Sequence, residues 1–239
     1  MDECLIRQYP ELESRHFWWA SRRELVIDLI GGLRRGHGTS VLDVGCGSGF
    51  LARELATSGA TVMGVDTVSH PQWDSAGAGV FCEGDYLELA PELGVFDTVL
   101  ALDVTELVGD EGQFVSRLTG NVRPGGHVIV TVPAYAWLWS RHDDINQHFR
   151  RYTRSRLVGI LTAGGLEVMR CGYIFFGLIG PKILEKGLLA LHDSETVSVP
   201  PPWLNRTALA YFRLEHRFAV RRRDFLPAGT SVVAVCRRR

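Results

Sequence analysis

Short apolar runs of strand length recur along this 239-residue chain. Seven can be recognised, at residues 40–44, 61–65, 79–82, 96–102, 127–132, 166–176 and 231–236. Segments with helical spacing of apolar residues separate most of them, at residues 11–34, 50–56, 113–121 and 154–163. Strands that alternate with helices pack as a parallel sheet with helices on both faces. The pattern therefore predicts an α/β protein built on a doubly wound sheet.

Two segments fall outside this alternation. Residues 1–36 precede the first strand, and we expect them to form an N-terminal helical lid, with a helix packed on the sheet as the alternative. Residues 177–227 separate the last two strands and contain a rigid proline linker at 200–202 and a predicted helix at 203–221. The apolar content of this insertion makes it a candidate substrate wall. Both segments are expected to belong to a single domain spanning residues 1–239.

The most informative turn follows the first strand. Gly45, Gly47 and Gly49 are spaced Gly-x-Gly-x-Gly and lead into a helix, so the backbone can pass close to a flat polar ligand. Asp43 precedes the first glycine by two residues, and the spacing differs from the Gly-x-Gly-x-x-Gly of nicotinamide and flavin enzymes. A carboxylate here favours a ligand that carries a cation, such as an ammonium or a sulfonium. The alternative is an ordinary glycine turn of an α/β domain.

The run from Leu42 to Gly49 resembles motif I of the class I methyltransferases, which use S-adenosylmethionine. Three later segments match the same family in order, at residues 64–66, 83–86 and 123–126. The resemblance implies S-adenosylmethionine as the cofactor, with its methionine part over the glycine turn. It also implies that Asp66 accepts from both ribose hydroxyls and that Asp85 accepts from the adenine amino group. Either acid could instead serve only its own turn.

The resemblance also specifies the sheet. In this family the sheet is Rossmann-like and seven-stranded, with six parallel strands and the last antiparallel, so residues 177–227 become a helical insertion between strands six and seven. The cofactor-binding candidates lie in or beside the matched motifs and are Asp43, Gly45, Gly47, Gly49, Asp66, Asp85, Tyr86, Asp103, Trp18 and Arg22.

Further elements are similar to those of a narrower bacterial group: His16–Arg22 reads HFWxxxR, and His148–Thr153 reads HxRRYT. In this reading Trp18 helps to cover the cofactor, and Arg22 or the adjacent Arg23 reaches its methionine carboxylate. One departure matters. After strand four many relatives read Asp-Val-Leu-Glu-His, whereas this chain ends the element with Leu107, so no role of that histidine carries over.

The loop after strand five holds the catalytic candidates, because ligands in such sheets bind outside the carboxyl ends of the strands. His148 is the first candidate for a general base, Asp144 would orient it, and His142 is a weaker candidate. Alternatively, His148 tethers the next helix. The substrate-binding candidates in the same loop are Trp137, Arg150, Arg151 and Tyr152. Alternatively, one of the two arginines pairs with Asp143 or Asp144 and holds the loop.

The composition of the chain limits the classes of partner that we expect it to bind. The net charge of −1 gives no general attraction to nucleic acid or to an anionic membrane. The five cysteines are odd in number and lack a Cys-x-x-Cys pair, which indicates reduced thiols and no metal site. The N-terminus has no apolar signal region, and the apolar stretch at 173–180 is too short to span a bilayer. We therefore expect a cytoplasmic protein without stable membrane insertion.

The favoured function is methylation of a small molecule, most simply at oxygen, in a secondary-metabolite or glycan-related pathway. Two alternatives stay open: an RNA or protein methyltransferase, and a non-catalytic partner protein that binds S-adenosylmethionine. Methylation of amines on nucleic-acid bases typically uses an Asn/Asp-Pro-Pro-aromatic motif after strand four. This chain has Leu-Asp-Val-Thr at residues 102–105, which argues against that chemistry.

Overall fold

A computed structural model describes residues 10–33, 38–74, 79–188, 198–221 and 225–239. Seven strands form one sheet: β1 (Ser40–Val44), β2 (Thr61–Asp66), β3 (Val80–Glu83), β4 (Phe96–Leu102), β5 (Val122–Pro133), β6 (Leu166–Ile174) and β7 (Ser231–Arg238). Their order is β3-β2-β1-β4-β5-β7-β6, and only β7 runs antiparallel to its neighbours. The predicted doubly wound sheet, with six parallel strands and an antiparallel last strand, is confirmed.

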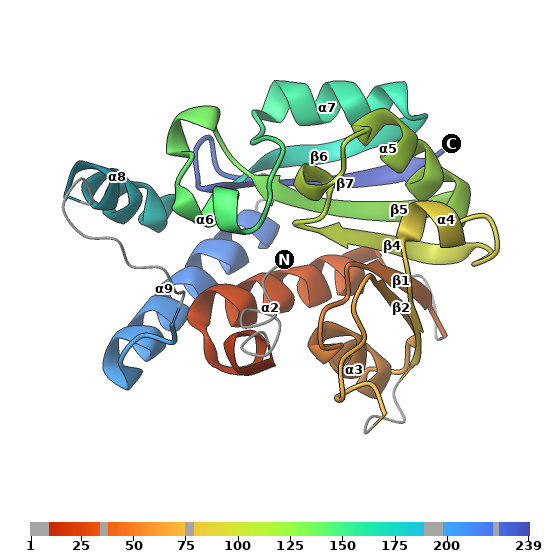
Figure 1. Cartoon of the computed structure of the whole chain (residues 1–239), viewed down its shortest axis with the longest axis horizontal. Coiled ribbons are helices and arrows are strands. Elements are labelled where there is room, and N and C mark those ends of the chain that lie inside the picture. The colour runs from red at the N-terminus through yellow and green to blue at the C-terminus, as the bar shows by residue number, and fades with distance from the viewer. Residues whose placement is uncertain (1–9, 34–37, 75–78, 189–197, 222–224) are drawn as a thin grey trace.

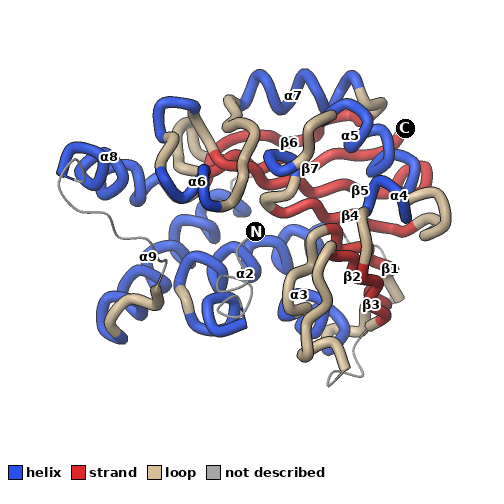
Figure 2. The backbone as a smooth tube through the Cα atoms, viewed as in Figure 1, coloured by secondary structure: helices blue, strands red, loops and turns tan. Residues whose placement is uncertain are grey.

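Helices cover both faces of the sheet (Figure 1). One face carries α2 (Phe17–Leu33), α3 (Phe50–Thr57) and α9 (Pro202–Arg221), and the other carries α4 (Tyr86–Leu89), α5 (Glu111–Asn121) and α7 (Arg154–Ala163). Two further helices, α6 (Arg141–Ile145) and α8 (Ile179–Leu188), lie beyond the end of the sheet. Figure 2 shows the strands as one continuous sheet between the two helical layers.

Side chains of the central strands enter two separate cores. On β5, Val128, Val130 and Val132 face the α5 and α7 core, whereas Ile129 faces the α2 and α9 core. All four are fully buried. This double burial explains why the strands read as continuous apolar runs rather than as alternating patterns.

Two strand boundaries differ from the prediction. β5 begins at Val122 rather than at residue 127, because Val122 already pairs with Phe96 of β4, and residues 123–126 form an irregularity between this pair and the next pair, His127 with Thr98. β6 ends at Ile174 rather than at residue 176, because Phe175 adopts a left-handed conformation with φ of 61°. A strand cannot continue through that conformation.

The predicted N-terminal helix is interrupted. Residues 10–15 are helical, and α2 then starts afresh at Phe17. Asn205 of α9 causes this restart, because its side-chain oxygen accepts from the Phe17 amide at 2.8 Å and its amide nitrogen donates to the Arg15 carbonyl at 2.7 Å. The insertion therefore contacts the N-terminal segment directly. Residues 1–9 and 34–36 of the predicted lid lie outside the described residues.

The predicted insertion contains more helix than its sequence indicated. Its predicted helix at 203–221 is confirmed as α9, whereas α8 was not predicted. Residues 189–197 and 222–224 of the insertion lie outside the described part of the chain. Among the helices that the structure describes, none combines the length and apolar character needed to cross a membrane.

Candidate functional site

The glycine turn lies at the carboxyl end of β1 and leads directly into α3. Gly45, Gly47 and Gly49 have φ of 72°, 54° and 79°, a region that favours glycine. The Gly45 amide donates to the carbonyl of Val65 on β2 at 2.8 Å, which fixes the turn against the neighbouring strand. A side chain at Gly45 would also collide with Val104, which follows β4. The turn is thus exposed at Gly45 and half-buried at Gly47, and it has little room for any other residue type.

Two of the predicted acids meet at this turn. Asp43 is buried at the end of β1, and burial raises its pKa to about 7, although the nearby Arg22 guanidinium lowers it. Asp66 ends β2, and its carboxylate accepts from the Gly47 amide at 2.8 Å and from the Val68 amide at 3.3 Å. The site therefore concentrates negative charge where the sequence predicts a cationic ligand.

Glu13 is a third acid at the turn, and the sequence analysis missed it. It comes from the helical residues 10–15, and its carboxylate accepts from the Ser48 hydroxyl and, at 3.4 Å, from the Ser48 amide. Burial raises the pKa of Glu13, opposed by these hydrogen bonds and by Arg22. No local signal marks this residue, because its partners lie 35 positions further along the chain.

Arg22, rather than Arg23, faces the site. Its guanidinium pairs with the Asp103 carboxylate at the end of β4 and lies 4.5 Å above the Trp18 ring. Arg23 instead donates to Glu54 of α3 at 2.8 Å. Trp18 also stacks on Phe175, with 5.6 Å between ring centroids. The Trp18 ring thus packs on the residue that follows β6 and on the core of this sheet face, which agrees with the alternative of a helix packed on the sheet.

Beside the glycine turn, two aromatic residues occupy a place that the sequence analysis left unassigned. The Trp73 indole donates to the Gly47 carbonyl at 2.9 Å and stacks on Phe81, with 5.2 Å between ring centroids. Phe81 lies so close to Gly49 and Gly64 that a side chain at either glycine would collide with it. These rings give the turn an apolar wall on the β2 and β3 side.

Asp85 and Tyr86 have structural partners. Asp85 is exposed and caps α4, where its carboxylate accepts from the Leu87 amide at 2.7 Å. Tyr86 is buried in the core, and its hydroxyl donates to Asn121 at 2.8 Å. The predicted roles of Asp85 and Tyr86 at the cofactor both stay predictions, although the Tyr86 side chain packs in the core.

The loop after β5 positions His148 through a buried carboxylate. Asp143 accepts from His148 Nδ1 at 2.8 Å and from Arg151 Nε and Nη2 at 2.7 and 2.9 Å. Although burial opposes ionisation, these hydrogen bonds hold the pKa of Asp143 well below its usual range. Arg151 is buried and also donates to the Ala134 carbonyl at 3.0 Å. The alternative in which an arginine pairs with Asp143 and holds the loop is therefore what the structure shows.

Asp144 does not orient His148, contrary to the prediction. Its carboxylate accepts from the Trp139 indole at 2.9 Å. The prediction assumed one helix through both residues, but α6 ends at Ile145 and Gln147 takes a left-handed conformation with φ of 57°. The chain reverses there, so the neighbouring Asp143 reaches the histidine instead.

The remaining candidates of this loop have varied surroundings. His142 is exposed, with its ring centroid 6.2 Å from that of His148. Trp137 is half exposed and stacks on Tyr135.

Two other candidates of this loop share a partner, Glu111. Arg150 donates to the Gly109 carbonyl at 2.8 Å and to Glu111 at 3.3 Å. Tyr152 is fully buried, and its hydroxyl donates to the same Glu111 at 2.8 Å. Arg151 and Tyr152 therefore stabilise the loop and cannot meet an acceptor directly.

Glu106 is a further residue of the site that was not predicted from the sequence. It is fully buried in the turn after β4, and its two carboxylate oxygens have no hydrogen-bond partner in the described structure. Burial raises its pKa well above the usual range, and Asp103 raises it further, while Arg22 and Arg151 act in the opposite direction. The pKa of Glu106 is thus influenced by charges of the Arg22–Asp103 pair and by Arg151 of the His148–Asp143–Arg151 group. Glu106 therefore links the two halves of the site electrostatically.

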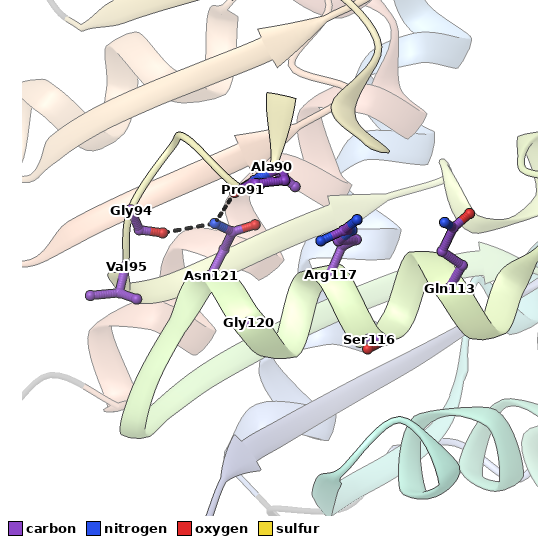
Figure 3. Close-up of a pocket in the computed structure, with 9 residues that line it drawn as sticks. All are labelled: Ala90, Pro91, Gly94, Val95, Gln113, Ser116, Arg117, Gly120 and Asn121. Carbon is purple, nitrogen blue, oxygen red and sulfur yellow. Dashed lines mark hydrogen bonds between the residues drawn. The ribbon is translucent and has the colours of Figure 1, made fainter. Parts of the chain in front are cut away.

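A separate pocket of about 480 Å³ lies between α5 and residues 90–95, near the amino end of β4 (Figure 3). Asn121 of α5 donates to the Ala90 and Gly94 carbonyls at 2.8 and 2.7 Å across one end of this pocket. These bonds hold the 90–95 loop against α5. Because the candidate residues gather at the carboxyl ends of the strands, this pocket lies apart from them.

Comparisons with known proteins identify a family and several relatives that this chain matches. A family model described as a methyltransferase domain matches residues 9–170. The chain is 42% identical over 106 residues to a ubiquinone biosynthesis O-methyltransferase of Azorhizobium caulinodans, a match that covers 41% of this chain and 42% of the relative. It is 31% identical over 161 residues to the protein of the same name from Pectobacterium atrosepticum, covering 58% and 65%. The chain thus spans only part of these relatives.

The fold is also found among solved structures. N-methyltransferase NodS from Bradyrhizobium japonicum, in complex with S-adenosyl-L-homocysteine, superposes with a TM-score of 0.56 at 13% identity. The superposition covers 95% of this chain and 90% of that protein. At this level of identity the likeness establishes a shared fold.

Proposed function

The chain belongs to the methyltransferase domain family, and on this premise we propose that it transfers a methyl group from S-adenosylmethionine to an oxygen atom of a small molecule. The observation that carries the proposal is the group of three carboxylates, Asp43, Glu13 and Asp66, around the glycine turn. The relatives named as O-methyltransferases of ubiquinone biosynthesis support oxygen as the methylated atom and a small biosynthetic intermediate as the acceptor.

The residues at the turn suit this cofactor. Its sulfonium and ammonium are cations, and Asp43, Asp66 and Glu13 bring negative charge to one place. Its carboxylate is an anion, for which the Arg22 guanidinium is the matching partner. Glycines at positions 45, 47 and 49 let the chain turn tightly beside these acids, and the Glu13 carboxylate lies directly over Gly47. The Trp73 and Phe81 rings offer an apolar wall for a flat aromatic group.

His148 is the base in this proposal. When bound, S-adenosylmethionine supplies a methyl group on a cationic sulfur, from which an oxygen nucleophile can displace it. With Nδ1 protonated and donating to Asp143, the lone pair of His148 Nε2 is available to take the proton of an acceptor hydroxyl. The oxygen freed of its proton would then displace the methyl group: as the O–C bond forms, the S–C bond breaks and its electron pair stays on the sulfur of S-adenosylhomocysteine. Arg151 holds Asp143 by two hydrogen bonds, and the ionised Asp143 stabilises the protonated imidazole.

Binding and turnover test the proposal in sequence. We expect calorimetry to detect S-adenosylmethionine and S-adenosylhomocysteine but no comparable binding of NAD. Release of S-adenosylhomocysteine is then measured against a panel of phenolic and aliphatic hydroxyl compounds. Preferential binding of NAD would reject the proposal. Cofactor binding without turnover of any acceptor would favour a non-catalytic binding protein, and a salt-dependent shift on an RNA gel would favour an RNA methyltransferase.

The role of His148 has its own test. We expect His148→Ala to lower turnover by roughly 10²–10⁴-fold, because a general base contributes about that much, with cofactor affinity nearly unchanged. His142→Ala is the matched control, since that residue is an exposed histidine of the same loop. A His148→Ala protein with lower thermal stability and a nearly normal rate would show that His148 only tethers the loop.

A further inference from the structure

Helix α9 has apolar side chains on two opposite sides. On the inner side, Phe212, His216 and Ala219 are buried, and the helix packs against α2. On the outer side, Trp203 and Leu214 expose 71% and 70% of their surface. A helix that only covers the sheet needs one apolar side, with polar residues opposite. The outer side of α9 therefore requires a separate explanation.

The outer residues form a continuous stripe rather than scattered exceptions. Trp203, Tyr211 and Leu214 are spaced by eight and three residues, which places them on one side of the helix, with Leu204 at its edge. We call these four residues the outer α9 stripe. Tyr211 and Leu204 are also exposed. Single exposed apolar residues are ordinary, but an aligned set that includes tryptophan and tyrosine is typical of an interaction surface.

A row of arginines runs beside the outer α9 stripe. Arg206, Arg213 and Arg217 are exposed and recur at spacings of seven and four residues. The acid in this part of the helix, Glu215, turns inward, where it accepts from the Phe175 and Phe176 amides at 2.6 and 3.2 Å. One arginine of the row, Arg213, pairs with Glu24 of α2 at 2.5 Å. The net charge of −1 for the whole chain thus hides a local strip of positive charge.

The apolar surface continues beyond α9. The Tyr211 ring packs on Gly177, and the neighbouring Phe176 is half exposed. Ile183 and Leu184 of α8, which follow a few residues later, are also exposed. Figures 1 and 2 show α8 and the start of α9 at the same end of the molecule.

We propose that the outer α9 stripe and its arginine row bind the surface of an anionic lipid bilayer. Helices that lie in a membrane interface combine apolar and aromatic residues, which enter the lipid, with arginines that meet anionic headgroups. The long arginine side chains can reach the headgroups while the stripe is buried. A second copy of this chain suits the surface less well, because antiparallel pairing of two α9 helices would bring their arginine rows side by side. This inference does not depend on the identity of the methyl acceptor.

Vesicle co-sedimentation of the full chain tests the proposal. We expect binding to phosphatidylcholine vesicles that contain phosphatidylglycerol, weaker binding to pure phosphatidylcholine, and loss of binding as salt is raised. Leu214→Glu should weaken binding to the anionic vesicles at least tenfold. The double change Arg206→Glu and Arg217→Glu should remove the preference for anionic lipid. Val95→Glu is the matched control, because Val95 is similarly exposed and lies beside α5, far from α9.

Folding and oligomeric state complete the test. Each variant should keep the thermal midpoint and the S-adenosylmethionine affinity of the parent, so that any loss of vesicle binding reports the surface alone. Absence of binding by the parent protein, or equal losses for Leu214→Glu and Val95→Glu, would overturn the proposal. Light scattering that shows a dimer dispersed by Leu214→Glu, without vesicle binding, would identify the stripe as a contact between copies and would overturn it too.

Discussion

At the scale of single residues, the site is organised by buried carboxyl groups in two kinds of surroundings. Asp143 is buried but meets the guanidinium of Arg151 and the ring of His148, so it stays ionised. Asp43 is equally buried, and its pKa is raised to about 7 by burial. A buried carboxyl group such as Asp43 is stabilised in its ionised form by a cation from outside the chain. A cationic cofactor supplies that charge.

Asp43 should therefore make cofactor binding depend on pH. A cationic ligand favours the ionised carboxylate, so binding lowers the Asp43 pKa and releases a proton. We expect the affinity for S-adenosylmethionine to rise with pH, by at most about tenfold per unit below pH 7, and to level off above it. Calorimetry in buffers of different ionisation enthalpy measures the proton release. Asp43→Asn should remove most of it, and an unchanged release in that variant would contradict the assignment.

Asp66 should contribute strongly to cofactor affinity. Its carboxylate already fixes the Gly47 amide, and it is predicted to accept from the ribose hydroxyls. Loss of a hydrogen bond to a charged group costs roughly 1.5–3 kcal/mol, so we expect Asp66→Ala to bind the cofactor about ten- to a hundredfold more weakly. Asp110→Ala is the control, because Asp110 also accepts from a backbone amide but caps α5. Equal affinities for the two variants would make Asp66 only a turn residue.

At the scale of elements, the N-terminal segment and the insertion depend on each other. The start of α2 is held by Asn205 of α9, although the two lie 188 positions apart in the sequence. Helix α2 carries Trp18 and Arg22, and the helical residues just before it carry Glu13. The position of α9 therefore determines how this side of the site is closed.

Asn205→Ala should weaken the cofactor site from a distance. The change removes a helix cap and one bond to the Arg15 carbonyl, which together cost about 1–2 kcal/mol of unfolding free energy. We expect a several-fold loss of cofactor affinity in addition, because Glu13 and Arg22 would be less well positioned. Thr207→Ala, two residues further along the exposed side of α9, is the control. Normal cofactor affinity in a destabilised Asn205→Ala protein would show that the helix cap stabilises the fold but does not position the cofactor site.

At the scale of the whole molecule, Glu106 should shape the dependence of stability on pH. Its pKa is raised in the folded state by burial and by Asp103, so the folded chain retains a proton that the unfolded chain loses above about pH 4.5. The free energy of unfolding should therefore fall as pH rises through that window. Glu106→Gln should be more stable than the parent at pH 8 and close to it at pH 5.

Urea unfolding at both pH values measures this effect. Glu92→Gln, an exposed change, is the control and should keep the slope of the parent. A Glu106→Gln protein with the same pH slope as the parent would show that Glu106 gains a compensating partner when the chain is folded.

Much of the architecture could be predicted because it depends on local patterns. Burial on both faces makes each strand a continuous apolar run, and the glycine turn and strand-end acids follow from backbone requirements at fixed spacing. The predicted class of chain, a methyltransferase, is confirmed by the family match. Boundaries were less predictable where a single backbone conformation decides them, as at Phe175, which ends β6.

The sequence by itself determined the alternation of strands and helices, the antiparallel last strand by family resemblance, and the residues of the glycine turn. Only the tertiary structure decided which side chains meet across it. It placed Glu13 on Ser48, chose Arg22 over Arg23, replaced Asp144 by Asp143 as the partner of His148, and buried Glu106 without a hydrogen-bond partner in the described structure. These contacts depend on how separate elements approach one another and on where short loops reverse. Periodicity and motif spacing describe each segment alone, so they carry no information about contacts between side chains of distant segments.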